Sequence, residues 1–170
     1  GCNIELPHEQ APNPYLDRML LASRETLGCQ LISRQQSARA LARALQQERA
    51  LGIVVDRRVD GGAPLRFFGL DKPSTLLPAK LSLRSGRPLV PIRVQRIRDA
   101  RFRVTLGSPI VERDPGATED SRAQDMMQRF HELLEQWIVE DPADWFCSKR
   151  IWPKATLAAH TQGQTLPGDG

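Results

Sequence analysis

The sequence predicts an α/β fold in which a mostly parallel sheet is flanked by helices, with a long C-terminal helix. Short apolar runs typical of buried strands alternate with longer stretches whose apolar residues recur at helical spacing. The resulting order of strand, helix, strand, helix, strand, helix, strand is typical of α/β domains with right-handed crossovers. We therefore expect one domain over residues 1–154 and a disordered tail over 155–170, where the periodicity is lost.

The first third of the chain predicts three strands and two helices. Asn13-Pro14 is a typical helix start, because Asn caps free N–H groups and Pro fits the first helical position. Gly28 is a suitable stop for this helix. Residues 51–55 form a continuous, β-branched run, as in parallel strands buried on both faces. The expected strands are residues 4–6, 29–32 and 51–55, and the expected helices are 14–27 and 38–45.

The rest of the chain predicts one short helix, two strands and one long helix. Asp71-Lys72-Pro73 is a helix-start signal, and Pro78 should delay or kink the helix, which is expected to end near Gly86. Residues 89–94 and 102–106 have the pattern of strands. Between residues 123 and 138, apolar side chains recur every three or four positions, which is the clearest helical pattern in the sequence.

The charge pattern favours anionic ligands. The formal charge is +4, and the 24 basic residues include only four lysines, so 20 are arginines. Arginine suits planar, two-point contact with phosphate or carboxylate. Because the arginines are scattered among acids and no aromatic-basic stacking platform is visible, we do not expect nucleic acid as a partner.

The cysteine content and the termini limit the other possibilities. Three cysteines without a C-x-x-C spacing indicate neither a disulfide framework nor a zinc site, and they fit a reducing cytoplasmic setting. No metal or other cofactor is expected. No apolar run approaches the roughly 18 residues of a membrane span, and no signal peptide opens the chain. Gly1-Cys2-Asn3 lacks an initiator Met and leads directly into a predicted strand, so we expect a fragment.

Two candidate site residues follow predicted strands. Arg34 comes after one strand and Asp56 after another, and neighbouring parallel strands would bring both to the edge where α/β proteins bind ligands. The arginine could bind a phosphate, or the two could form a structural ion pair, and the residues alone do not decide between these roles. Arg24 could be a second anchor, although its place near a helix end favours a role in balancing the helix dipole.

The segment after Asp56 combines cationic, flexible and aromatic residues. Arg57 and Arg58 precede the pair Gly61-Gly62, which allows a tight turn, and Phe67-Phe68-Gly69 follows. A site that is cationic at one end and apolar at the other suits an amphiphile. The alternative is that the arginines are solvated while one phenylalanine enters the core and the other caps it.

The sequence offers no convincing general base or nucleophile. His131 lies beside Phe130 on the long helix and is expected at the surface or its boundary, while His8 and His160 fall in a predicted loop and tail. No His or acid pattern points to Cys147 as a nucleophile. The segment around Trp145, Phe146 and Trp152 could lie at a membrane interface or pack as a C-terminal helix.

Five ordered segments together resemble a known family. They are NPYLDRMLLASRETLG (13–28), LISR (31–34), GIVVDRRVDGGAPLRFFG (52–69), GRPLVPIRV (86–94) and DWFCSKRIWPK (144–154). Their order and spacing resemble the lipid A biosynthesis acyltransferases, lauroyl and myristoyl transferases of the lysophospholipid-acyltransferase-like superfamily. The resemblance runs roughly from Leu6 to Lys154.

The resemblance implies a reaction and a location. Members transfer a fatty acyl group from an acyl carrier protein thioester or acyl-CoA to a hydroxyl of a phosphorylated glycolipid, at the cytoplasmic face of the inner membrane. Their general base is the His of a His-x-x-x-x-Asp/Glu motif, which this sequence lacks. In the family that motif and a membrane anchor lie upstream of the segments matched here, so the 170 residues alone are expected to be inactive.

The resemblance also assigns residues. Arg24 and Arg34 match arginines thought to contact the phosphorylated acceptor, and Asp56 matches the acid that ends the central strand. Many relatives carry a second acid where Arg58 stands, which sets this site apart. The residues matching the family's substrate-binding loop and aromatic pair are Arg57, Arg58, Gly61, Gly62, Phe67, Phe68 and Gly69. Two other functions stay open: acyl transfer to a different glycolipid, and a catalytically silent domain that binds anionic lipid.

Overall fold

The computed structural model describes residues 4–8, 13–25, 30–33, 38–145 and 150–163. The chain forms two compact units, one of residues 1–54 and 81–87 and the other of residues 55–80 and 88–170. Each unit is described by itself. In the described residues, no helix is long and apolar enough to cross a membrane.

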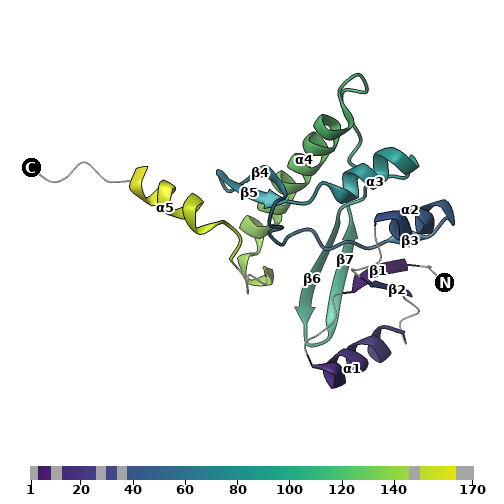
Figure 1. Cartoon of the computed structure of the whole chain (residues 1–170). Helices are drawn as coiled ribbons and strands as arrows, with labels where there is room; N and C mark the ends of the chain where they lie inside the picture. The colour runs from purple at the N-terminus through teal and green to yellow at the C-terminus, as the bar shows by residue number, and fades with distance from the viewer. Residues whose placement is uncertain (1–3, 9–12, 26–29, 34–37, 146–149, 164–170) are drawn as a thin grey trace, which may run out of the picture. The chain divides into compact units, whose positions relative to one another are not determined.

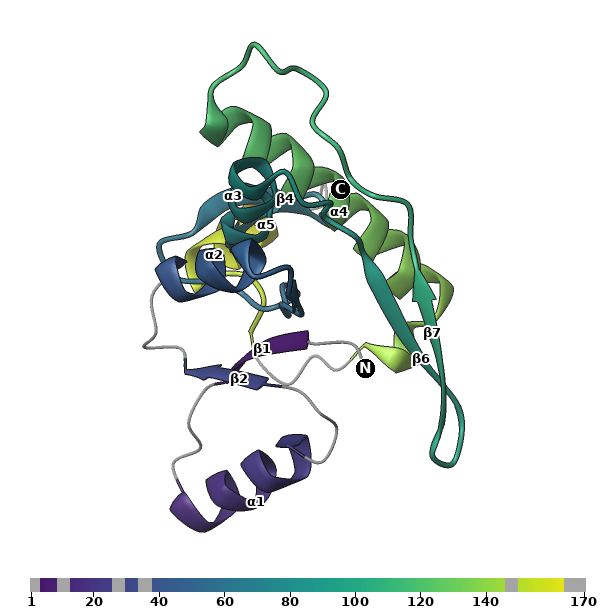
Figure 2. The same cartoon turned by 90° about the vertical axis from the view of Figure 1, so that its right-hand side faces the viewer.

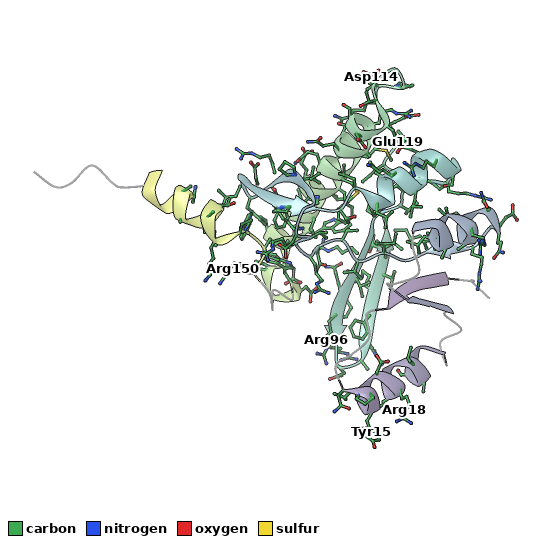
Figure 3. The ribbon with its side chains drawn as sticks, in the orientation of Figure 1. Tyr15, Arg18, Arg96, Asp114, Glu119 and Arg150 are labelled. Carbon is green, nitrogen blue, oxygen red and sulfur yellow. The ribbon has the colours of Figure 1, made fainter. Side chains whose placement is uncertain are left out.

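The first unit contains a parallel sheet and two helices. Strands β1 (Ile4–His8), β2 (Gln30–Ser33) and β3 (Ala50–Leu51) lie in the order β2-β1-β3, all parallel. Between them run α1 (Pro14–Glu25) and α2 (Ala38–Gln46), as predicted. The Asn13 side chain accepts hydrogen bonds from the backbone N–H groups of Tyr15 and Leu16, so the predicted cap is confirmed. Figure 3 shows Tyr15 and Arg18 on α1, where the guanidinium lies 5.2 Å from the ring centroid.

The predicted strand over residues 51–55 is mostly wrong. Only Ala50 and Leu51 pair with β1, and the chain leaves the sheet at Gly52, with Val54 77% exposed. An apolar composition predicts burial, whereas a strand also needs a neighbour to satisfy its N–H and C=O groups. That neighbour pairs with only two residues here.

The second unit is built from two hairpins and a long helix. Strands β4 (Ala63–Phe67) and β5 (Leu70–Ser74) form one antiparallel hairpin, which packs on α4 (Glu119–Glu140), as Figure 1 shows. Strands β6 (Ile92–Arg98) and β7 (Arg101–Leu106) form the second hairpin, a twisted two-stranded ribbon in Figure 2. The long predicted helix is confirmed as α4, and Thr118 caps it by accepting from the N–H of Ser121.

The expectation of one mostly parallel sheet is wrong for the second unit. The turn between β6 and β7 contains only Asp99 and Ala100, and that between β4 and β5 only Phe68 and Gly69. So short a link joins antiparallel strands, because parallel strands need a long crossover. The described strands therefore form a three-stranded parallel sheet and two antiparallel hairpins.

The helix start predicted at Asp71-Lys72-Pro73 is also wrong, because these residues belong to β5. Helix α3 (Leu77–Ser85) begins later, with Pro78 in its first turn, as its missing N–H allows. The sequence analysis did not predict that residues 63–74 form a hairpin. In the structure the hairpin turns at Phe68-Gly69, where both residues have positive φ, 49° and 73°, as in two-residue hairpin turns of type I′.

The described part of the segment after α4 contains two further short helices. A short 3₁₀ helix (Pro142–Asp144) follows α4, and α5 (Lys154–Gly163) occupies most of the expected tail. Residues 164–170 lie outside the described residues. Trp145 and Trp152 pack against a cluster of Phe67, Ile138 and Ile151, which supports the packed alternative for this segment.

Candidate functional site

The β4–β5 hairpin separates its two phenylalanines. The Phe67 side chain is fully buried, and its ring contacts those of His131, Trp145 and Trp152 at centroid distances of 5.5, 6.0 and 5.9 Å. The Phe68 ring lies 4.9 Å from that of Phe67 but stays 38% exposed. The sequence alternative in which one phenylalanine enters the core and the other caps it is therefore confirmed for the packing.

Side chains of α4 and the C-terminal segment hold the outer edge of β4. The Gln128 amide accepts from the N–H of Arg66 and donates to its carbonyl, in the manner of a neighbouring strand. A Glu135 carboxylate oxygen accepts from the N–H of Phe68 at 2.6 Å, and the Trp152 indole donates to the carbonyl of Phe67. These bonds hold Phe68 at a positive φ that a bulky residue rarely adopts.

A polar cluster lies beneath this hairpin. The Lys72 ammonium donates to Nε2 of His131 at 3.2 Å, and the Ser74 hydroxyl lies 3.1 Å from the same nitrogen. The His131 Nδ1 atom lies 2.8 Å from the carbonyl of Met127, so Nδ1 carries the proton and Nε2 accepts. All three side chains are almost fully buried. The expectation that His131 lies at the surface is wrong.

Burial and charge shift both titrations in this cluster. Burial, with the neighbouring Lys72 charge, lowers the pKa of His131 to about 4. Burial also lowers the pKa of Lys72 to about 8, and the negative charge of Asp56 partly opposes this shift. At neutral pH the histidine is neutral and the lysine is largely charged. The cluster is a buried cation that is held by a neutral acceptor and stabilised electrostatically by the Asp56 carboxylate.

Among the predicted site residues, Asp56 is the one whose charge acts on this cluster, because it raises the pKa of Lys72. Its side chain is half-buried, and its Oδ1 atom has no hydrogen-bond partner. A carboxylate oxygen in that condition costs free energy unless a ligand, water or cation satisfies it. Arg58 instead pairs locally with Asp60 at 3.0 Å, and Arg57 is exposed.

The glycines serve the geometry of this hairpin. Gly61 has a φ of 74°, and the Gly62 N–H closes a turn on the carbonyl of Val59. A Cβ on Gly62 would lie 2.5 Å from the carbonyl oxygen of Ser74, so only glycine fits there. Beside them opens a pocket of about 330 Å³ that reaches Lys80, which pairs with Asp120 at 2.5 Å. Gly69 completes the turn after Phe68.

The two remaining predicted site residues belong to the first unit. Arg24 lies in α1, but its side chain is outside the described part of the chain, and Arg34 is outside it altogether. The proximity of Arg34 to Asp56 therefore stays a prediction. Cys147 and Phe146 are likewise outside the described residues, while His160 lies exposed on α5 and His8 ends β1.

Sequence reasoning missed Lys72, Ser74 and His131 as a cluster. A signal for His131 was present, because Met127, His131, Leu134 and Ile138 are spaced by four, three and four residues along one helical face. A histidine in the apolar stripe is buried and needs a partner. The position of Lys72 gave no such signal, because the sequence pattern of residues 71–73 favoured a helix start.

Comparison with known families defines the class of protein. Asp56 lies in the loop that follows β3 and not directly at the end of a strand, as the sequence had predicted. The described residues form a mixed fold of helices and strands with a Phe-Phe-Gly hairpin turn, and a family match spans residues 6–154. The matching family is described as bacterial lipid A biosynthesis acyltransferase. The chain belongs to this family, and its class is that of acyltransferases. No curated protein matches the sequence.

Proposed function

We propose that this chain carries the acceptor-binding and acyl-facing part of an acyltransferase that esterifies a phosphorylated glycolipid in lipid A biosynthesis. The observation that carries the proposal is the family match over residues 6–154. The acyl donor is an acyl carrier protein thioester or acyl-CoA. The site of action is the membrane surface at the cytoplasmic face of the inner membrane.

The chemistry divides between residues of this chain and a base supplied outside it. The acceptor hydroxyl oxygen bonds to the acyl carbonyl carbon, the carbon–sulfur bond breaks, and the thiol leaves. A base takes the hydroxyl proton and returns it to the sulfur. No His-x-x-x-x-Asp/Glu motif occurs among the 170 residues, so we propose that they do not transfer acyl groups alone.

The residues of this chain would hold the two ends of the acceptor complex. Arg24 and Arg34 would bind the acceptor phosphate through charge-assisted hydrogen bonds, and Arg57 is an exposed cation beside Asp56 in sequence. The unsatisfied Oδ1 of Asp56 would accept a hydrogen bond from the acceptor. The half-exposed Phe68 ring would border the hydrocarbon.

The test is acyl transfer by the complete gene product that contains this sequence, with acyl carrier protein and coenzyme A thioesters compared as donors. We expect ester formation on a phosphorylated glycolipid by the complete product and none by residues 1–170. Transfer by residues 1–170 alone would show that the base is within them. A complete product that binds anionic lipid without any transfer would favour the silent lipid-binding alternative.

A further inference from the structure

The turn between β4 and β5 carries a bulky residue at a position that favours a small one. A two-residue turn of type I′ needs positive φ at both central positions, which Asn-Gly and Gly-Gly adopt readily. Here the first position is Phe68, with a φ of 49°, and the second is Gly69, with a φ of 73°. The left-handed region disfavours a bulky side chain. Such a residue stays in this conformation only where the surrounding structure holds it.

Glu135 of α4 holds Phe68 in this conformation. Its Oε1 atom accepts a hydrogen bond from the backbone N–H of Phe68 at 2.6 Å, and the Glu135 side chain is half-buried. An ionised carboxylate is a stronger acceptor than a neutral group. Phe68 lies one residue beyond the end of β4, so the bond acts on the turn and not on the pairing of the two strands.

Other contacts hold the strand itself. The Gln128 amide bonds to the backbone N–H and carbonyl of Arg66, and the Trp152 indole donates to the carbonyl of Phe67. Neither these bonds nor the ladder between β4 and β5 involves Glu135. Loss of the Glu135 carboxylate should therefore release the turn and leave the hairpin paired.

The conformation of the turn determines where the Phe68 ring lies. The ring centroid is 4.9 Å from that of the buried Phe67 and 6.3 Å from that of Trp145, with 35° between the planes of the second pair. Phe68 and Trp145 are both partly exposed, so they present aromatic surface next to the buried cluster. A change of φ redirects the Cα–Cβ bond and the rotamers available to the side chain. A turn that relaxed to negative φ would therefore move the ring.

We propose that Glu135 is a positioning residue that holds the Phe68 ring against the hydrocarbon chain of a lipid substrate. The inference rests on the proposed function, in which this ring borders the hydrocarbon. A turn that served folding alone would need no ring at its first position, because asparagine or glycine adopts the same φ at a lower cost. A strained residue with a partly exposed aromatic ring therefore indicates that the ring itself is required.

Amide hydrogen exchange in the 170-residue chain, followed by NMR, tests whether Glu135 holds the turn. Glu135→Ala should speed the exchange of the Phe68 amide by about tenfold or more, because the N–H loses its acceptor. Glu135→Gln should keep most of the protection, since its side-chain oxygen still accepts. The Arg66 amide, which donates to Gln128, should keep its wild-type rate in both variants. An unchanged Phe68 rate in Glu135→Ala would overturn the proposal.

Steady-state acyl transfer by the complete gene product tests the role in substrate binding, with KM measured separately for the acyl donor and for the glycolipid acceptor. Glu135→Ala and Phe68→Ala should each raise the KM for the same substrate by about threefold or more, with a smaller effect on kcat. The substrate affected identifies whose hydrocarbon chain meets the ring. The double variant should match Phe68→Ala alone, because Glu135 acts through the ring. Glu135→Gln should restore most of the wild-type KM.

Glu132→Ala is the matched control, because it removes an exposed carboxylate from the same helix, and its KM values should stay within about twofold of the wild type. A wild-type KM in Glu135→Ala, or additive effects in the double variant, would overturn this inference. Acyl transfer by the wild type would then still support the proposed function. No transfer by the wild-type complete product would instead overturn the proposed function, and this inference with it.

Discussion

The Nζ atom of Lys72 lies 3.2 Å from Nε2 of His131, and neither side chain is exposed to solvent. A buried ammonium needs a hydrogen-bond acceptor, and a neutral imidazole nitrogen can accept that bond without adding a second charge. The pair joins β5 to α4 beneath the Phe68-Gly69 turn. The stability of the β4–β5 hairpin therefore depends on this contact.

The His131→Ala variant should lose about 2–4 kcal/mol of unfolding free energy, because it leaves the Lys72 ammonium without its acceptor and opens a cavity. Urea denaturation of the chain at neutral pH measures this loss. His160→Ala on the exposed side of α5 is the matched control and should change stability by less than about 0.5 kcal/mol. If both variants lost less than about 0.5 kcal/mol of unfolding free energy, His131 would not stabilise the fold through Lys72.

Acid should destabilise the fold through the same residue. The pKa of His131 is about 4 in the folded chain against 6.5 for a free imidazole, so the unfolded chain binds the proton more readily. The unfolding free energy should therefore fall as the pH drops from about 6.5 to about 4, by up to about 3 kcal/mol. His131→Leu should remove this part of the pH dependence. A denaturation series that shows the same slope in both proteins would contradict the assignment.

Lys72→Met should change the pH profile at both ends. Loss of the lysine charge raises the pKa of His131 and so reduces the acid sensitivity. The wild type should gain stability between about pH 8 and 10.5, because the Lys72 pKa is lower folded than unfolded, and the variant should not. Titration of the His131 ring by NMR, together with alkaline denaturation, measures both changes. If the pKa of His131 were the same in Lys72→Met as in the wild type, the lysine charge would not act on the histidine.

Gly62→Ala should destabilise the hairpin by about 2 kcal/mol or more, because its Cβ would meet the backbone of Ser74 at 2.5 Å. Gly107→Ala is the matched control, since its nearest neighbour would lie at 3.5 Å, an ordinary contact. Thermal unfolding of both variants gives the comparison. Similar unfolding midpoints in the two variants would mean that the backbone at Ser74 can shift to accommodate the added Cβ at little cost in free energy.

The two phenylalanines should separate folding from function. Phe67→Ala should cost about 3–5 kcal/mol of stability, as for other buried aromatic side chains. Phe68→Ala should cost less than about 1 kcal/mol, because its ring is partly exposed and its φ is unfavourable. In the complete gene product, Phe68→Ala should still raise the KM for the lipid substrate. An unchanged KM would exclude the ring from the lipid path.

Local patterns predicted α1, α2 and α4, because the Asn13 cap and the apolar stripes of these helices depend on residues close in sequence. They placed the start of α3 too early and did not predict α5. The hairpins were not foreseen as hairpins, because a turn through Phe68 at positive φ depends on hydrogen bonds from α4, about 67 residues away. The extent of β3 likewise depends on its partner strand and not on its own composition.

The site was predicted in part. Asp56, the glycine pair and the phenylalanines stand out by position and type, and all lie in the second unit with the described hairpin. Lys72 and His131 meet only through the packing of β5 on α4, which no spacing in the sequence encodes. Their burial, and so their shifted pKa values, could be learned only from the fold.

The most direct test of the central claim is the rate of acyl transfer by the complete gene product carrying Arg34→Ala or Asp56→Ala. Each change should lower the rate by at least about tenfold, the effect of losing a charge-assisted contact worth roughly 1.4 kcal/mol. Asp60→Ala, at an exposed loop acid, should leave the rate within about twofold of the wild type. Unchanged rates in both site variants would contradict the assignment of these residues to the acceptor site.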